Sequence, residues 1–341
     1  MAREDFSIAG IQVAPGSRTM VDLPLPKLYS HTDLSMPVHV IHGKRDGPRM
    51  FVSAAVHGDE VNGVEIIRQL LAHKSLRNVR GTLLAVPVVN VYGLIHESRY
   101  LPDRRDLNRS FPGSESGSLA ARLAHQFMTE IVGRCTHGID LHTGAIHRAN
   151  LPQIRANLDD PETERLARAF EVPVMLNSAL RDNSLRQAAA ACGIPMLLYE
   201  AGEALRYDAL SIRAGVHGVI QVMRALEMLP LPSRRKKLVV DPFVARASSW
   251  IRAPESGMLR TTIQLGARVR SGEILGYIND VYSDNHVSVE APFRGVVIGS
   301  IMKPAVHEGD ALFHVARFKD DLSDVAEGVD NFHQVHGDEI D

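Results

Sequence analysis

Hydrophobic and polar positions follow two different periods between residues 50 and 229. Short apolar runs, the pattern of buried strands, fall at residues 50–56, 83–89, 139–141, 174–176 and 196–199. The spacing of apolar residues over 65–71, 119–132 and 210–228 instead predicts helices. Strands that alternate with helices indicate an α/β fold, with a mixed, mostly parallel sheet flanked by helices.

Ser184 is a suitable N-cap for a further helix through the alanine run at 188–191, and Gly193 lies just beyond its expected end. We therefore expect one α/β domain over residues 1–229, including an N-terminal β-rich segment. Residues 230–240 read as a linker, since they combine prolines with the basic run 234–237. Such a run can bind an acidic partner, but a solvated linker is the plainer interpretation.

The pattern changes again in residues 241–318, which are β-rich and punctuated by glycine. Residues 253–259 resemble residues 291–297, and each segment is followed by a valine-centred turn and a glycine–acid pair. Two similar halves of this kind resemble the biotinyl/lipoyl carrier sandwich. The turn that would carry the modified lysine falls near residues 282–285 and contains none, while Lys303 lies within the second half. We therefore expect a structural module, or one that shapes an active-site entrance.

Residues 319–341 are acidic and poorly periodic, which predicts a partly disordered tail.

The composition of the chain excludes several classes of function. A net charge of −2 gives no general affinity for nucleic acid or for a membrane surface. No apolar run reaches the roughly 18 residues of a membrane span, and the N-terminus lacks the pattern of a signal peptide. Cys135 and Cys192 make neither a disulfide framework nor a metal-binding spacing, so we expect a cytoplasmic protein.

Polar residues follow three of the predicted strands. His57 and Glu60 come after the first, Asp140 and His142 close the third, and Glu200 follows the last. The carboxyl ends of strands in an open α/β sheet meet at one rim. Singly, each of these residues is more simply a hydrogen-bonded loop residue or, for Glu60, an acid near a helix N-terminus. Together they match a catalytic zinc site, in which H-x-x-E and a distant histidine leave one position for water.

A fourth polar segment contains Asn108 and Arg109. Its plainer interpretation is a solvated loop. An amide donor beside a planar guanidinium is also suited to bind a carboxylate, and a further arginine can stabilise an oxyanion.

These motifs resemble the succinylglutamate desuccinylase/aspartoacylase family, which is related to the zinc carboxypeptidases. The matching motifs, in the family's order, are His57-Gly58-Asp59-Glu60, Asp106-Leu107-Asn108-Arg109 with Phe111-Pro112-Gly113, Asp140-Leu141-His142-Thr143-Gly144 and Glu200-Ala201-Gly202. The resemblance covers about residues 38–229, and the β-rich part is also similar to the family's C-terminal domain. It implies a zinc carboxypeptidase-like fold and, at the level of the family, a possible homodimer.

The resemblance also implies roles for single residues. His57, Glu60 and His142 would hold one Zn²⁺ per subunit, and Glu200 would act as general base. His147 is a competing metal ligand. Asp140 either orients a ligand histidine or merely ends its strand, and Glu203 is an alternative to Glu200.

Substrate binding falls to the fourth segment. The resemblance makes Asn108 and Arg109 the residues that bind a substrate carboxylate. Arg99, which is followed by a tyrosine as in the family, would face the oxyanion. Its spacing to Asn108 is longer than usual, so Arg104 and Arg105 remain alternatives.

The sequence thus predicts hydrolysis of the amide bond of a small N-acyl amino acid or N-acyl amine by metal-activated water. A zinc carboxypeptidase acting on peptides would use the same chemistry. A different class is a carrier or binding module built on the C-terminal β domain, with biotin or lipoate on Lys303. A metal-binding protein without catalysis is a third alternative, although the set of ligands together with Glu200 argues against it.

Overall fold

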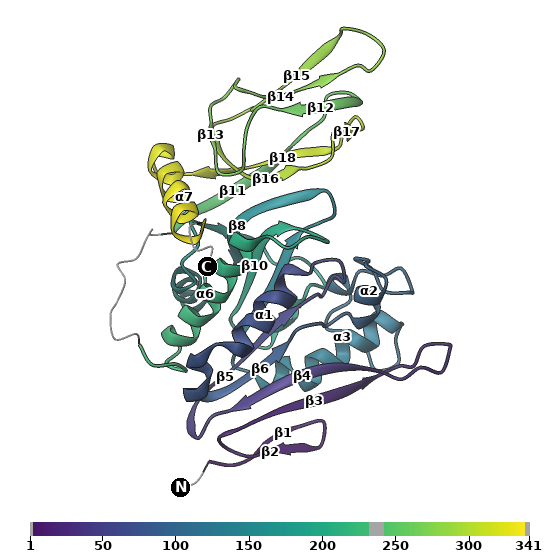
Figure 1. Ribbon diagram of the computed structural model, residues 1–341, viewed down its shortest axis with the longest axis vertical. Helices are drawn as coiled ribbons and strands as arrows, with labels where there is room; N and C mark the ends of the chain where they lie inside the picture. Colours follow the sequence, from purple (N-terminus) through teal and green to yellow (C-terminus); the bar gives the residue numbers. More distant parts are fainter. Residues whose placement is uncertain (1–2, 232–241, 338–341) are drawn as a thin grey trace.

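The computed structural model describes residues 3–231 and 242–337 and has two parts, an α/β domain and a β module (Figure 1). The strands of the α/β domain are β1 (Phe6–Ile8), β2 (Ile11–Val13), β3 (Ser17–Leu25), β4 (Leu34–His42), β5 (Arg45–Ala54), β6 (Arg80–Val86), β7 (His137–Gly144), β8 (Arg148–Ala156), β9 (Val174–Asn177) and β10 (Met196–Glu203). Its helices are α1 (Asn62–Ala72), η1 (Lys74–Asn78), α2 (Val91–Ile95), η2 (Leu107–Arg109), α3 (Leu119–Glu130), η3 (Val132–Arg134), α4 (Pro161–Ala169), α5 (Leu185–Ala191) and α6 (Ala209–Ala225).

The β module contains β11 (Phe243–Arg252), β12 (Gly257–Thr261), β13 (Arg268–Val269), β14 (Ile274–Asn279), β15 (His286–Glu290), β16 (Gly295–Ile301), β17 (Ala305–Val306) and β18 (Ala311–Phe318), followed by α7 (Leu322–Gly337).

The main sheet of the described residues has twelve strands in the order β13-β16-β18-β11-β9-β8-β10-β7-β5-β6-β4-β3. Its middle is parallel, since β5 pairs in parallel with β6 and β7, and β7 with β10. Antiparallel pairs lie outside this region, including β4 with β6 and β8 with β10. The predicted mixed α/β fold is confirmed.

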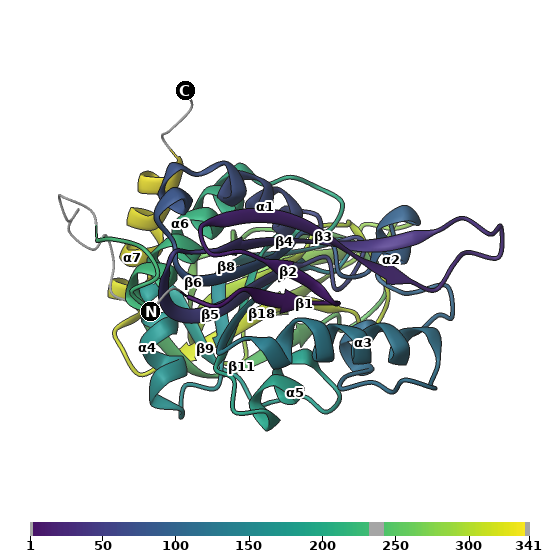
Figure 2. The same cartoon turned by 90° about the horizontal axis from the view of Figure 1, so that it is seen from below.

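Helices cover both faces of the parallel strands, with α1 and α6 on one side and α3 and α5 on the other (Figure 2). Ile66 of α1 and Val219 of α6 belong to one apolar core, which also includes residues of α4. Phe127 of α3 and Ala188 of α5 belong to the other. Burial on both faces explains why these strands read as continuous apolar runs.

The predicted strands and helices are present, and their boundaries differ from the predicted ones by a few residues. β5 ends at Ala54 rather than at Val56, because Ala55 takes a positive φ of 49° and turns the chain out of the sheet. β7 extends to Gly144, well beyond the predicted run. β8 was not predicted, because its sequence RANLPQIRA contains no apolar run.

The β module shares the main sheet with the α/β domain. Its strands β11, β13, β16 and β18 continue that sheet, while β12, β14, β15 and β17 form a second sheet, and an apolar core fills the space between them. β11 pairs with β9, and β16 pairs with β8. The five strands β8, β9, β11, β18 and β16 therefore form a closed ring of hydrogen-bonded neighbours.

The turn that the repeat predicted lies between β14 and β15, at residues 280–285, and contains no lysine. Lys303 lies instead just before β17, with its Nζ 3.7 Å from a carboxylate oxygen of Asp310.

The prediction of a poorly periodic, partly disordered tail was wrong for residues 322–337, which form α7. Val325, Val329 and Phe332 recur at helical spacing on one buried face, and α7 contacts α6. The helix was not predicted because the segment is acidic and only these few apolar residues indicate it. The basic run 234–237 lies outside the described residues.

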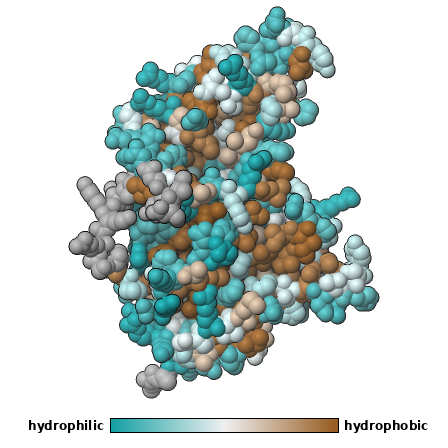
Figure 3. Space-filling model, in the orientation of Figure 1, coloured by the Kyte–Doolittle hydropathy of each residue, from teal (hydrophilic) through white to brown (hydrophobic). Residues whose placement is uncertain are grey.

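No helix in residues 3–231 and 242–337 is long and apolar enough to cross a bilayer. The face seen in Figure 3 mixes hydrophilic and hydrophobic residues over both the α/β domain and the β module.

One histidine of the module makes stability depend on pH. Burial of His314, with the charges of Arg155 and Arg181 nearby, lowers its pKa to about 3 from the ordinary 6.5. The unfolded chain therefore binds this proton at a higher pH than the folded chain does, and stability falls as the pH drops below 6.5. The loss is at most about 1.4 kcal/mol per pH unit from this group.

Trp250 stacks on His314, so replacing His314 with phenylalanine keeps a ring in that place and removes the titration. We expect the His314→Phe variant to lose less unfolding free energy than the wild type between pH 6.5 and pH 4, measured by urea denaturation. The exposed His307 provides the control, since His307→Phe should retain the wild-type slope. Identical slopes for all three proteins would contradict the assignment.

Candidate metal centre

The site lies where three parallel strands end. Ser53 of β5 pairs with Asp140 of β7, and His142 of β7 pairs with Glu200 of β10. Side chains alternate between the faces of a strand, so residues paired in register share a face. Ile139, Leu141, Leu197 and Tyr199 accordingly enter the core beneath α1 and α6. Asp140, His142, Leu198 and Glu200 face a cavity on the opposite side.

His57 and Glu60 reach the same cavity from the turn after β5. The backbone N–H of Glu60 donates to the carbonyl of His57 at 3.1 Å, which closes the turn just before α1. Gly58 lets this turn pack closely against the backbone of Gly93, because a Cβ at residue 58 would lie 2.0 Å from the carbonyl carbon of Gly93. A short turn fixed by backbone packing thus holds the histidine and the carboxylate on one side.

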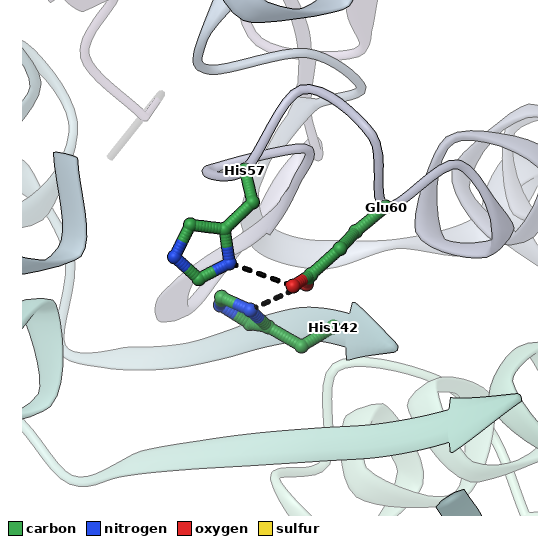
Figure 4. Close-up of side chains that lie close together, drawn as sticks. All are labelled: His57, Glu60 and His142. Atoms are coloured by element: carbon green, nitrogen blue, oxygen red, sulfur yellow. Dashed lines mark hydrogen bonds and ion pairs between the residues drawn. The ribbon is translucent and has the colours of Figure 1, made fainter. Parts of the chain in front are cut away.

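The structure brings His57, Glu60 and His142 together. Their ligand atoms all lie within 4.8 Å of one another, and all three side chains are buried. His57 Nδ1 lies 2.7 Å from Oε1 of Glu60, and His142 Nδ1 lies 2.7 Å from Oε2 (Figure 4). The two imidazole rings and the carboxylate therefore point at a common position.

Each histidine is also held from behind by a carboxylate. Nε2 of His57 lies 3.1 Å from Asp106, and Nε2 of His142 lies 2.7 Å from Asp140. The hydroxyl of Ser53 donates in turn to Asp140 at 2.7 Å. Metal-binding histidines typically have such a partner, which fixes the ring and its tautomer. Asp140 therefore does more than end its strand.

Contacts within the cluster favour the ionised form of its carboxylate and the protonated form of its histidines. Burial opposes ionisation of Glu60, yet the neighbouring His57 and His142 hold its pKa well below the usual range. Burial likewise opposes protonation of the two histidines, but Glu60 and the carboxylates behind them raise the pKa of both. The carboxylates around the two imidazole rings thus attract positive charge, and a divalent cation would satisfy the same groups.

The donor set fits a divalent metal. Two imidazole nitrogens and one carboxylate, oriented by second carboxylates, are the protein ligands of a catalytic zinc site with an open position. His147, the competing ligand, is exposed and lies outside this group of donors.

Glu200 lines the same cavity and has a defined orientation. Asn150 Nδ2 donates to its Oε2 at 2.8 Å, and a guanidinium nitrogen of Arg155 lies 3.8 Å from its Oε1. Glu203 does not line the cavity and lies 3.4 Å from Arg206 instead. Of the two candidate bases, only Glu200 lines the cavity that contains the candidate metal ligands.

Arg99 contacts the cluster directly. One of its nitrogens lies 3.3 Å from Oε1 of Glu60, and two others donate to Asp106 at 3.0 and 3.2 Å. Arg104 and Arg105 are exposed and lie outside the cavity lining. Of the three arginines considered from the sequence, only Arg99 reaches the site.

Asn108 and Arg109 both line the cavity. The side-chain oxygen of Asn108 accepts from the backbone N–H of Leu185 at 2.9 Å, at the start of α5. This bond fixes the orientation of the amide, so that its Nδ2 can donate to a ligand.

Three residues in or beside the cavity were not predicted from the sequence. Asp106 was part of a motif but had no role assigned, and an acid near an arginine was its only signal. Asn150 lies on the strand that was not predicted. Trp250, the chain's single tryptophan, comes from the β module and stacks on His314 with ring centroids 4.7 Å apart.

Comparison with known proteins agrees with this geometry. The catalytic-domain model of the succinylglutamate desuccinylase/aspartoacylase family matches residues 46–226, more than half of the chain. The protein belongs to this family. A curated relative, N-alpha-acetyl-L-2,4-diaminobutyric acid deacetylase of Halomonas elongata, is 25% identical over 336 residues, covering 94% of this chain and 96% of the relative.

Solved structures share the fold. A succinylglutamate desuccinylase/aspartoacylase from Rhodobacter sphaeroides superposes with a TM-score of 0.79 at 24% identity, covering 89% of this chain and 95% of that one. The product-bound ectoine utilization protein EutE (DoeB) from Ruegeria pomeroyi gives a TM-score of 0.78 at 24% identity, covering 88% and 95%. At this identity the likeness shows the fold alone.

The carboxylates behind the histidines should control metal affinity. We expect Asp106→Asn and Asp140→Asn each to weaken binding of a divalent metal about 10- to 100-fold, because the ligand rings lose their orienting partner. Competition with a chromophoric chelator measures this. His147→Ala is the control and should bind metal like the wild type. Unchanged affinity in both aspartate variants, or metal loss in His147→Ala, would overturn the assignment.

Proposed function

We propose that the protein is a zinc-dependent hydrolase that cleaves the amide bond of a small N-acyl amino acid or N-acyl amine. One observation carries the proposal. The ligand set His57, Glu60 and His142 and the carboxylate of Glu200 face a single cavity of about 240 Å³. Both family membership and the deacetylase activity named for the Halomonas elongata relative support this reaction class.

Zinc in such a site acts as a Lewis acid towards a carbonyl and lowers the pKa of bound water to about 7. Glu200 then serves as the general base. It accepts a proton from the attacking water through its carboxylate and passes that proton to the departing amine. Asn150 occupies one carboxylate oxygen of Glu200, so the other is available for this transfer.

Arg99 is suited to stabilise the oxyanion that forms on the carbonyl oxygen. Its guanidinium is held beside Glu60 by Asp106. A positioned donor of this kind typically contributes about 3–4 kcal/mol to the transition state. Asn108 and Arg109 bind the carboxylate of the amino acid through an amide donor and a guanidinium.

The size of the cavity favours a small substrate over a peptide. A volume of about 240 Å³, bounded on one side by Trp250 of the β module, leaves little room beyond a single acylated amino acid. A carboxypeptidase acting on peptides is therefore the weaker candidate. A carrier role is weaker still, because the turn at residues 280–285 has no lysine.

The Glu200→Gln variant tests the assignment of the base. We expect turnover to fall at least about 10³-fold, because the amide cannot accept the proton, while zinc content stays near one per chain. A panel of acetyl-, succinyl- and formyl-amino acids, assayed by amine release with and without chelator, measures the activity. Substantial remaining turnover would refute the role of Glu200, and undiminished activity after zinc removal would refute the proposal itself.

Asn150 should act as a positioning residue for Glu200. Loss of a hydrogen bond to a charged group typically costs about 1.5–3 kcal/mol, so Asn150→Ala should lower kcat about 10- to 100-fold with little change in KM. Gly299 of β16 pairs with Asn150, and a Cβ at Gly299 would lie 3.0 Å from its side-chain oxygen. Gly299→Ala should therefore lower kcat in the same direction.

Asn177→Ala is the matched control, since that asparagine bonds Leu158 and Asp159 away from the cavity. Equal changes in kcat for Asn177→Ala and Asn150→Ala would show a general loss of structure rather than positioning.

A further inference from the structure

The strand that carries Glu200 is irregular directly after that residue. From Glu200 to Glu203 the chain takes three steps along β10, while the residues of β7 that pair with them are only two apart. The pairing with β8 shifts at the same place. Ala201 is in register with neither β7 nor β8, both of which the structure describes in full. Bulges of this kind occur beside active sites, where they set the direction of a side chain.

The side chain of Asn62 holds this bulge. Its Nδ2 donates to the carbonyl oxygen of Ala201 at 3.3 Å, and its Oδ1 accepts from the backbone N–H of Asp208 at 3.0 Å. Asp208 is the N-cap of α6 and accepts from the backbone N–H of Ser211 at 2.6 Å, so the bulge is tied to the start of that helix. Asn62 is 2% exposed, and bulk water does not compete for its bonds.

Asn62 also connects the bulge to the candidate metal ligands. It is the first residue of α1 and comes two positions after Glu60. The backbone N–H of Leu205 donates to the carbonyl oxygen of Asp59 at 2.8 Å, which adds a second bond between the same two segments. The turn that carries Glu60 and the strand end that carries Glu200 are therefore fixed to each other.

Gly202 gives the amide of Asn62 its place against the bulge. The φ of Gly202 is 73°, in the left-handed region that favours glycine. A Cβ at residue 202 would lie 2.5 Å from Nδ2 of Asn62. The amide thus fills the space that any larger residue at position 202 would need.

The bonds of Asn62 serve the bulge and not its own helix. The N-cap position of α1 is Val61, whose side chain makes no capping bond. Asn62 also lies outside the lining of the cavity, so it does not reach a molecule bound there. Any effect of Asn62 on a reaction in the cavity must therefore pass through the backbone that it holds.

We propose that Asn62 is a positioning residue for Glu200. By holding the carbonyl group of Ala201, it keeps the carboxylate of Glu200 directed into the cavity beside the candidate metal ligands. This inference rests on the proposed function, in which Glu200 is the general base. Displacing a reacting group by about 1 Å can lower the rate about 100-fold, so the bulge needs a rigid support.

The Asn62→Leu variant removes both hydrogen bonds and keeps a side chain of similar size. We expect kcat to fall about 10- to 100-fold with KM near the wild-type value, because the base is displaced while the substrate contacts remain. Zinc content should stay near one per chain. Gly202→Ala places a Cβ against Nδ2 of Asn62 and should lower kcat in the same direction, which keeps the proposal testable if Asn62→Leu does not fold.

Thr163→Ala is the control for loss of a buried hydrogen bond. Thr163 is also a buried polar residue in the first turn of a helix, and its hydroxyl donates to Asp160 outside the cavity lining. Its replacement should leave kcat unchanged. An equal fall in kcat for Thr163→Ala and Asn62→Leu would indicate general damage and overturn the proposed role.

A double variant separates positioning from other effects on the site. If Asn62 acts only through Glu200, adding Asn62→Leu to Glu200→Gln should lower the residual rate less than about 2-fold. A loss in the double variant as large as the loss that Asn62→Leu causes in the wild type would contradict the proposal.

Crystal structures of the zinc-loaded wild type and Asn62→Leu give a test without turnover. We expect Oε2 of Glu200 to move away from Nδ2 of Asn150, which donates to it at 2.8 Å, while the three candidate metal ligands keep their places. If the wild type hydrolyses no N-acyl compound but this displacement is seen, the proposed function is wrong and the positioning by Asn62 stands. An unmoved Glu200 in the variant would refute the inference whatever the wild type hydrolyses.

Discussion

The site is organised by the need to compensate one buried charge. Glu60 is 2% exposed, and an isolated carboxylate at that depth would be protonated or would destabilise the fold. It is ionised because His57, His142, Arg99 and the backbone N–H of Thr143 all contact it. These partners come from three separate segments of the chain. The same contacts that compensate Glu60 therefore bring the candidate metal ligands together and place a guanidinium beside them.

Much of this arrangement could be predicted because it depends on local pattern. Apolar runs located the strands, and polar residues at their ends located His57, Glu60, His142 and Glu200. The rest depends on register between distant strands. Asn150 meets Glu200 only because β8 lies beside β10, and nothing in the sequence of β8 indicates a strand. α7 was missed for a related reason, since its apolar stripe becomes significant only against the sheet strands and the part of α6 on which it packs.

The β module contributes to the cavity of the α/β domain. Trp250 lines the cavity, holds Arg148 by a cation–π contact and stacks on His314. β16 lies directly against Asn150, and Gly299 leaves the space that the asparagine side chain needs. The module therefore both lines the cavity and packs against the residue that bonds Glu200. A separate accessory domain would do neither.

Folding and aggregation of the chain also depend on the closed ring of strands, which consists of β8, β9, β11, β18 and β16. Because hydrogen-bonded strands from both parts close it, the two parts should unfold as one cooperative unit. A chain that ended before β11 would leave β9 with a free, apolar edge, the kind that pairs with other molecules and aggregates. The same ring means that strands in the second half of the chain must be made before the first half is fully enclosed.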